Sequence, residues 1–302
     1  MNTDSVAVLS ANSRSAILLA VLALMLHGCV REPQAGHQRV GALGRYPMTS
    51  ETVQQWKLPK KLREISGLAI DADGRLFAIT DEEAIVYQVD FEDGRLVKAF
   101  ALGKPTVKGD FEGIAIDRGD FFLTTSEGDL YRFREGDDGE RVDYAKTETG
   151  LGEHCEIEGL AIRERELLFL CKNVRSRSML DKLVIFRWPT SPGVHEMIGM
   201  IELPEAKILD RVGRDHLNPS GLAVDAATGN LVLVAAQQKV LVEINADGGL
   251  VQALRMPLKG RHRQAEGIEF SHSGQLLISD EGGNRRARIA VYSEAEPGEK
   301  NE

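Results

Sequence analysis

Three glutamates in this sequence share one local setting, directly before a glycine and an apolar run. Glu112, Glu158 and Glu266 stand in the phrases "DFEGIAID", "EIEGLAIR" and "QAEGIEFS". The related phrases "EISGLAID" and "NPSGLAVD" carry Ser66 and Ser220 at the same place. Carboxylates that a fold brings close together repel one another, so they take up protons, pair with cations or hold a metal. The chemistry to test is therefore that of a cation site rich in oxygen ligands.

The glycine of the phrase recurs at a nearly constant interval. Its copies are Gly67, Gly113, Gly159, Gly221 and Gly267, separated by steps of 46, 46, 62 and 46 residues. A fixed period of this length indicates a repeat architecture. The longer step exceeds the others by 16 residues, and we expect that insertion between residues 187 and 220.

Each repeat contains four short β-rich runs separated by turns. In the first, "SGLAID", "RLFAIT", "IVYQVD" and "RLVKAFAL" are divided by "ADG", "DEEA" and "EDG". Four antiparallel strands in about 45 residues are typical of a propeller blade. We therefore predict an all-β fold, a five-bladed β-propeller of four-stranded antiparallel blades. The last repeat ends before its fourth strand, which Glu51–Leu58 can supply to close the ring in one blade.

A six-bladed, NHL-like propeller is the alternative, if the long step hides a degenerate blade. The 16 additional residues are too few for a blade, which favours five.

The N-terminus has the features of an export signal. Ser15–Leu26 is an apolar run too short for a confident membrane span, and it is followed by Cys29 in "LHGC". This ending resembles the lipobox of bacterial lipoproteins; a plain secretory signal or a short anchor is the alternative. We expect a signal peptide over residues 1–28, a lipidated Cys29 with a flexible tether over 29–50, the propeller over 51–294 and a disordered tail over 295–302.

The resulting protein would be a membrane-anchored lipoprotein of the cell envelope that faces the periplasm. Val30 after Cys29, in place of an aspartate, favours the outer over the inner membrane. An exported chain meets oxidising conditions, so Cys155 and Cys171 can form a disulfide or remain as two buried thiols.

Composition restricts the partners. The chain has 302 residues, 42% of them hydrophobic and 27% charged, which is an ordinary globular balance. A net charge of −9 argues against a nucleic-acid partner bound through bulk charge. We expect a monomer whose membrane contact is its lipid anchor.

The repeated motifs resemble those of a known family. "EISGLAI…LFAITDE", "DFEGIAI…FLTTSE" and "QAEGIEF…LLISDE" are similar to the SdiA-regulated, YjiK-like family of bacterial envelope proteins, over roughly residues 50–294. The resemblance implies a five-bladed propeller with a bound calcium and no established enzymatic activity.

A calcium site at one mouth of the central channel follows from this architecture and the resemblance together. In a propeller the first strand of each blade lines the channel, and the end of the second strand reaches the same mouth. Calcium accepts carboxylate, amide and water oxygens, and no Cys/His cluster has zinc spacing. The predicted ligands are Glu112, Glu158, Glu266, Asp81, Glu127 and Asp280. The alternative is that each repeated glutamate only bonds to the neighbouring blade.

Basic and histidine side chains fall in loops assigned to the same mouth. Arg175, Arg263 and Arg286 lie in arginine-rich loops, and His154, His216 and His262 each stand five residues before a phrase glycine. We predict a basic rim that binds an anionic small molecule or an envelope protein, since arginine forks suit phosphate and carboxylate groups. Ordinary solvated loops are the alternative.

Two functions are consistent with these features. The first is a non-catalytic binding or docking module that carries calcium. The second is a calcium-dependent hydrolase of the lactonase or esterase type, with His154, His216 or Asp280 as the base. The chain has no G-x-S-x-G nucleophile motif, and a fold alone assigns no activity.

Overall fold

The computed structural model describes residues 41–48, 53–177, 182–191, 193, 196–256 and 262–295. The signal segment, Cys29, most of the tether and the tail after residue 295 lie outside these ranges. In the ranges described, no helix is both long enough and apolar enough to cross a bilayer.

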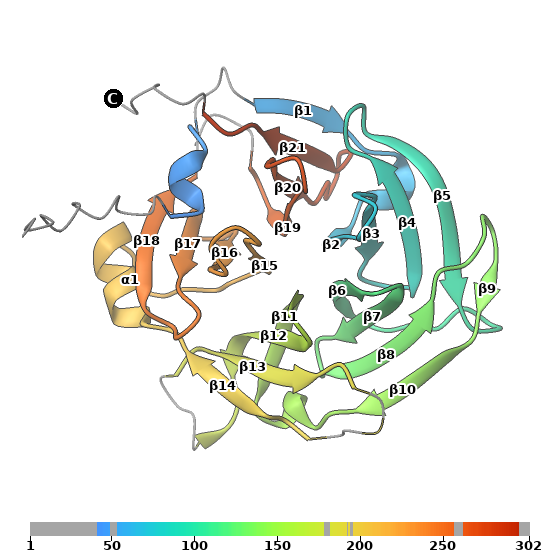
Figure 1. Ribbon diagram of the computed structural model, residues 1–302, viewed down its shortest axis with the longest axis horizontal. Helices are drawn as coiled ribbons and strands as arrows, with labels where there is room; N and C mark the ends of the chain where they lie inside the picture. The colour runs from blue at the N-terminus through green and yellow to red at the C-terminus, as the bar shows by residue number, and fades with distance from the viewer. Residues whose placement is uncertain are drawn as a thin grey trace, which may run out of the picture. The chain divides into compact units, whose positions relative to one another are not determined.

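Five antiparallel sheets surround one axis (Figure 1), which confirms the five-bladed propeller. The strands of each sheet are given from the axis outward. The first sheet contains β2 (Ile65–Ile70), β3 (Leu76–Thr80), β4 (Ile85–Asp90) and β5 (Arg95–Leu102), and the second contains β6 (Phe111–Asp117), β7 (Asp120–Thr125), β8 (Asp129–Arg134) and β10 (Tyr144–Glu148). The third contains β11 (Cys155–Arg163), β12 (Glu166–Val174), β13 (Val184–Pro189) and β14 (Gly199–Glu202). The fourth contains β15 (Gly221–Val224), β16 (Leu231–Ala235), β17 (Val240–Ile244) and β18 (Leu250–Arg255). The fifth contains β19 (Ala265–Phe270), β20 (Leu276–Asp280), β21 (Arg288–Tyr292) and β1 (Val53–Lys57), and a short β9 (Arg141–Val142) extends the first sheet.

The chain ends close the ring as the sequence predicts. Strand β1 pairs antiparallel with β21, from Val53 opposite Tyr292 to Lys57 opposite Arg288. The long third-to-fourth step contains the helix α1 (Glu205–Val212) instead of a sixth blade. Its Ile208 and Val212 are buried in the apolar cluster between the third and fourth blades. Comparable clusters fill the other four interfaces between blades.

The phrase glycines allow the inner strands to meet at the axis. A Cβ on Gly113 would lie 2.5 Å from both the Cβ and the backbone nitrogen of Leu160, and one on Gly267 would lie 2.7 Å from Cγ of Leu68. The residue after each phrase glycine is large, apolar and buried; these are Leu68, Ile114, Leu160, Leu222 and Ile268. They leave an axial cavity of only about 10 Å³, room for at most one water. The channel therefore has two separate mouths.

Residues 41–48 pack onto the ring, although the sequence places them in the flexible tether. They include the 3-10 helix η1 (Leu43–Arg45), and both Ala42 and Leu43 are fully buried. Tyr46 is also buried, with its ring centroid 6.0 Å from that of Phe270. The packed domain thus includes residues before the boundary at 51 that we predicted.

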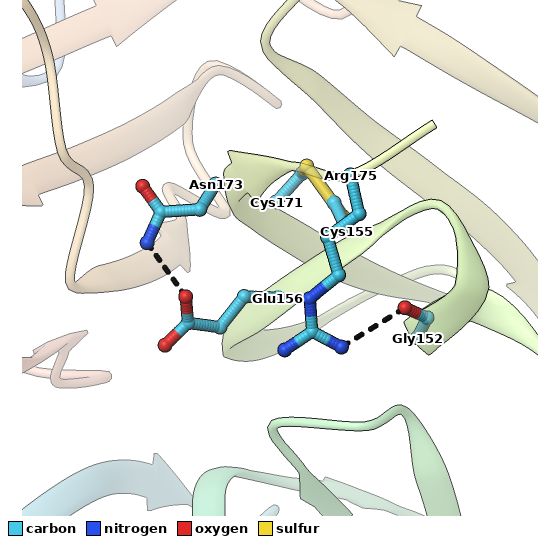
Figure 2. Close-up of a disulfide and its surroundings, with 6 residues drawn as sticks. All are labelled: Gly152, Cys155, Glu156, Cys171, Asn173 and Arg175. Carbon is cyan, nitrogen blue, oxygen red and sulfur yellow. Dashed lines mark hydrogen bonds between the residues drawn. A yellow bond between two sulfur atoms is a disulfide. The ribbon is translucent and has the colours of Figure 1, made fainter. Parts of the chain in front are cut away.

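A disulfide joins the inner two strands of the third blade (Figure 2). It links Cys155 on β11 with Cys171 on β12, whose Cα atoms are 5.8 Å apart. Both cysteines are fully buried. The structure therefore selects the bonded state from the two that the sequence left open.

Candidate functional site

A break in strand register directs the residue before each phrase glycine. The pairing of the inner strand with the second strand shifts at Ile65/Gly67, Phe111/Gly113 and Ala265/Gly267, and the third blade shifts at Ile157/Leu160. Such bulges leave one residue unpaired and change the direction of its side chain. The unpaired positions include Ser66, Glu112 and Glu266, so a recurrent backbone irregularity positions the acidic groups.

One mouth of the channel is a cavity of about 180 Å³ with an acidic lining. Its carboxyl groups belong to Glu64, Asp81, Glu112, Glu158, Glu266 and Glu281. Four of the six predicted metal ligands are therefore brought to one cavity, from blades one, two, three and five. Ser66 of the first blade donates a hydrogen bond of 2.9 Å to Glu112, so this glutamate also ties neighbouring inner strands together.

Lys172 is the cation of this mouth, and our sequence analysis missed it. Its Nζ donates a 2.6 Å hydrogen bond to Oε1 of Glu158, which is buried. The repeat offers a signal, because Lys172 follows the strand partner of Ile157, and the first two blades have Asp81 and Ser126 at this place. A lysine where these blades have an acidic and a hydroxyl residue, next to an acidic phrase, indicates an internal counter-charge.

The three repeated glutamates of the mouth, Glu112, Glu158 and Glu266, have raised pKa values and hold protons more tightly than usual. Burial, followed by the charge of Glu158, raises the pKa of Glu112. Burial also raises the pKa of Glu158, although the hydrogen bond from Lys172 opposes this shift. Burial and the Glu158 charge raise the pKa of Glu266 to about 8. One lysine thus compensates only part of the negative charge of this mouth.

Asp81 lies between the mouth and a second, larger cavity. Its Oδ1 is buried and has no hydrogen-bond partner among the described residues. Burial, followed by the charge of Glu64, raises the pKa of Asp81. A buried acceptor without a donor is costly, and the Asp81 side chain lines both cavities, so this carboxylate is suited to a bound cation or ammonium group.

The other two predicted metal ligands serve elsewhere. Glu127 is on the rim, where it accepts 2.8 Å hydrogen bonds from Arg175. Asp280 is buried inside the fifth blade, 2.7 Å from Nδ1 of His262 and 3.1 Å from the backbone nitrogen of Gln264. The other ring nitrogen of His262 lies 2.6 Å from the hydroxyl of Tyr292. His262 and Asp280 therefore hold the entry to β19 and do not face the channel.

The predicted basic rim is not one site. Arg175 also donates to the carbonyl of Gly152 (Figure 2), while Arg263 lines a separate cavity of about 250 Å³. Arg286 lines the large cavity beside Asp81. His154 packs against Phe186 with ring centroids 6.1 Å apart, and His216 is exposed.

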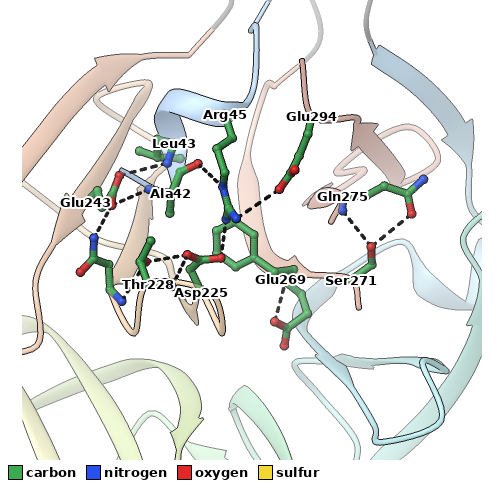
Figure 3. A network of polar contacts seen from close by, with 12 residues as sticks. Ala42, Leu43, Arg45, Asp225, Thr228, Glu243, Glu269, Ser271, Gln275 and Glu294 are labelled. Atoms are coloured by element: carbon green, nitrogen blue, oxygen red, sulfur yellow. Dashed lines mark hydrogen bonds and ion pairs between the residues drawn. The ribbon is translucent and has the colours of Figure 1, made fainter. Parts of the chain in front are cut away.

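Glu269 marks the opposite mouth, a cavity of about 270 Å³. The other four blades have alanine at its position, Ala69, Ala115, Ala161 and Ala223, which is the signal that our sequence analysis did not use. Its carboxylate accepts a 2.8 Å hydrogen bond from the backbone nitrogen of Phe270 (Figure 3). Burial raises the pKa of Glu269 to about 8, and the backbone hydrogen bonds only partly offset this effect.

Replacing Glu269 with glutamine is expected to stabilise the protein at alkaline pH. Free glutamate has a pKa near 4.3, so the unfolded chain loses this proton well before the folded protein does. The stabilisation linked to this proton is present below about pH 4 and is lost as the pH rises through about 8.

Relative to wild type, Glu269→Gln should gain about 4 kcal/mol in unfolding free energy between pH 5 and pH 8.5. Urea denaturation at both pH values measures this. Exposed Glu148→Gln should show no such difference, and an equal response of both variants would contradict the assignment.

The acidic mouth is not a preformed metal centre. Across the described residues, no three His, Cys, Asp or Glu side chains converge closely enough to hold an ion. The oxygen donors suit calcium in type, but they would have to move toward an ion.

The fold and its channel define the class, a five-bladed β-propeller with an acidic mouth. The SdiA-regulated family model matches residues 203–302, the part of the chain that contains the last two repeats, and there it confirms the predicted family resemblance. Among solved structures, the chain is similar to the glutaminyl cyclase of Myxococcus xanthus at 14% identity and a TM-score of 0.53, covering 80% of this chain and 96% of that one. It is also similar to a luciferin-regenerating enzyme at 9% identity and a TM-score of 0.50, with 80% and 95% covered. At these identities the similarity concerns the fold alone.

Proposed function

We propose that this protein is a non-catalytic binding module of the cell envelope that takes up calcium at the acidic mouth of its channel. The observation that carries the proposal is that Glu112, Glu158 and Glu266 reach one cavity from three blades and have one lysine among them. Burial is the main cause of their raised pKa values, and a bound cation would favour their ionised forms. Carboxylate oxygens, with the amide of Gln264, are ligands that calcium prefers.

Calcium would change the ionisation of the carboxyl groups at the mouth and the positions of the inner strands, and would not catalyse a reaction there. A divalent ion favours the ionised carboxylates and would draw the inner strands of several blades together. The family resemblance agrees with this role. Lys172 limits the site, because it already binds Glu158, so Glu112 and Glu266 are the ligands with the most to gain.

Calorimetric titration of the detergent-solubilised full chain with calcium tests the proposal. Glu112→Gln and Glu266→Gln should each weaken binding at pH 8 by about tenfold, as expected for the loss of one charged ligand. Glu127→Gln, which changes a carboxylate on the rim, should leave the titration unaltered. An unchanged titration in both mouth variants would rule out this site.

The pH dependence gives a second readout. Calcium binds the ionised carboxylates, whose pKa values are raised, so binding must displace protons. Affinity should therefore increase as the pH rises from about 6.5 to 8.5, through the pKa of Glu266 near 8. A flat affinity over this range would be inconsistent with these ligands.

Anchoring and partners belong to the same proposal. The lipobox-like "LHGC" supports a lipid on Cys29, and two or more acyl chains hold a protein stably to a bilayer. The intact mass of the membrane-purified chain should include acyl groups on Cys29, and an unmodified cysteine would refute the anchor. The ring would then act as a docking platform for an envelope protein or a small anionic molecule.

The hydrolase alternative has no specific observation in its favour. Among its three candidate bases, Asp280 is engaged by His262 inside a blade, His154 packs on Phe186 and His216 lies on the surface.

A further inference from the structure

A cavity of about 530 Å³ lies beside the channel mouth, between the first and fifth blades. One wall comes from η2 (Lys60–Leu62), Arg63 and the loop Asn284–Arg286, and the other from Thr80–Glu83 and Tyr87. Figure 1 shows β2 and β3 next to the sheet of β19–β21, so the cavity is a gap between neighbouring blades. Only Asp81 and Arg286 in this lining were predicted as site residues.

The first wall is strongly basic. It contains Lys60, Lys61, Arg63, Arg285 and Arg286. In the described part of the chain, Lys60, Lys61 and Arg285 form no ion pair, whereas Arg63 lies 2.6 Å from Glu64. Arg286 donates its Nε to the carbonyl of Leu58 at 2.7 Å, which fixes the guanidinium at the wall. Lysine and arginine in this arrangement suit a phosphate or carboxylate group.

The second wall is acidic and has an unsatisfied acceptor. Asp81 Oδ1 is buried without a hydrogen-bond partner in the described residues. Glu82 is exposed, and Glu83 is only 3.9 Å from Lys108, a weak surface pair. The buried Tyr87 also lines the cavity. This wall repels an anion and attracts an ammonium group.

We propose that this cavity binds a small zwitterion, with its anionic group on the basic wall and its primary ammonium group against Asp81. A simple anion would leave Asp81 unsatisfied and close to a like charge. A simple cation would face five basic side chains. Only a molecule with both charges complements both walls, and the cavity has room for a small one. The inference goes beyond the calcium proposal, because Glu112 and Glu158 do not line this cavity.

The test compares probes that carry both charges or one of them. The detergent-solubilised full chain is titrated by calorimetry with O-phosphoethanolamine, β-alanine, inorganic phosphate and ethanolamine, in EDTA and in calcium. At least one zwitterion should bind tenfold or more tightly than both single-charge probes, and equally well in EDTA. The stronger of O-phosphoethanolamine and β-alanine identifies a phosphate or a carboxylate as the anionic group.

Variants of each wall separate the two contributions. Arg285→Gln should weaken binding of the zwitterion about tenfold, as expected for one charged hydrogen bond. Asp81→Asn should remove the preference for the zwitterion over the anionic probe, inorganic phosphate. Lys207→Gln removes an exposed positive charge on α1, far along the ring, and should change nothing.

The zwitterion proposal can also be separated from the calcium proposal. Glu112→Gln should bind the zwitterion normally, so a failure of the calcium proposal leaves this one standing. No binding of either zwitterion, equal binding of zwitterion and single-charge probe, or binding only in calcium would overturn the proposal.

Discussion

Replacing Gly113 with alanine is expected to lower the free energy of unfolding by about 3 kcal/mol, near the upper end for an overpacked site. The added Cβ would lie 2.5 Å from both the backbone nitrogen and the Cβ of Leu160, on the next inner strand, and 3.0 Å from the backbone carbon of Gly159. These are main-chain and near-main-chain atoms at the axis, where five strands converge. No side-chain rotation relieves the contact, so an inner strand must move.

Gly159 provides a matched control at the same position of the next blade. A Cβ there would be 3.3 Å from the nitrogen of Leu222 and 3.4 Å from the side chain of Leu170, which is close to ordinary contact. Gly159→Ala should therefore cost about 1 kcal/mol or less. Chemical denaturation of both variants measures the difference. Equal costs would show that alanine is excluded by the strand conformation common to both sites, and not by the approach of the next blade.

The architecture could be predicted because it depends on period and turn chemistry. Gly67 and its four copies set the blade number, since only close backbone approach at an axis asks for the same glycine in every repeat. The missing fourth strand after Tyr292 predicted the pairing with β1. The 16-residue surplus proved too short for a blade and formed α1 instead.

The candidate site was only partly predictable, because the sequence does not reveal the register between strands. Asp280 is the last residue of β20 and pairs with Ala265, whereas Asp81 follows Thr80, the last residue of β3, which pairs with Ile65. This difference of one residue leaves Asp81 facing a cavity, while Asp280 is held by His262 inside the blade. His262 belongs to the loop before β19, and the repeat pattern of the sequence does not indicate that it contacts Asp280. The bulges that direct Glu112 and Glu266 are likewise invisible in an apolar run, since they arise from pairing between strands.

Residues that depart from the repeat pattern identify the site better than residues that follow it. Lys172 stands where two other blades have Asp81 and Ser126, and it binds Glu158; Glu269 replaces alanine at the opposite mouth. Contacts that close the ring are the same in every blade, so they require the same residue in every repeat. A residue whose charge differs from that of its counterparts therefore reflects a local requirement, at the acidic mouth or at the opposite end of the channel.

Glu243 is expected to be the residue that attaches the N-terminal segment, and Glu243→Ala should destabilise the protein by about 4 kcal/mol. Its carboxylate is fully buried and accepts four hydrogen bonds, of which Figure 3 shows those from the backbones of Ala42 and Leu43. Oε1 accepts from the backbone of Ala42 at 2.7 Å and from Asn230 at 2.5 Å, and Oε2 accepts from the backbone of Leu43 at 3.0 Å and from Gln252 at 2.8 Å. Truncation leaves these donors unsatisfied, at about 1–3 kcal/mol for each that water does not reach.

Glutamine at the same position tests whether the acceptors or the side-chain volume matter. Each oxygen of Glu243 serves two donors, so an amide NH₂ in either place would face donors only. Glu243→Gln should therefore lose about 2 kcal/mol despite its matching shape. Glu202→Gln is the control, because the side chain of Glu202 is 58% exposed and its pair with Lys182 is expected to contribute less than about 1 kcal/mol.

Amide hydrogen exchange distinguishes local from global effects of these variants. In the wild type, the amides of Ala42 and Leu43 should exchange slowly, since both donate to a buried carboxylate. In Glu243→Ala they should exchange rapidly under conditions where the amides of β16 remain protected, because the segment loses its acceptor while the blade persists. Protection of both amides in the variant would mean that the burial of Leu43 and Tyr46, not the carboxylate, holds residues 41–48 on the ring.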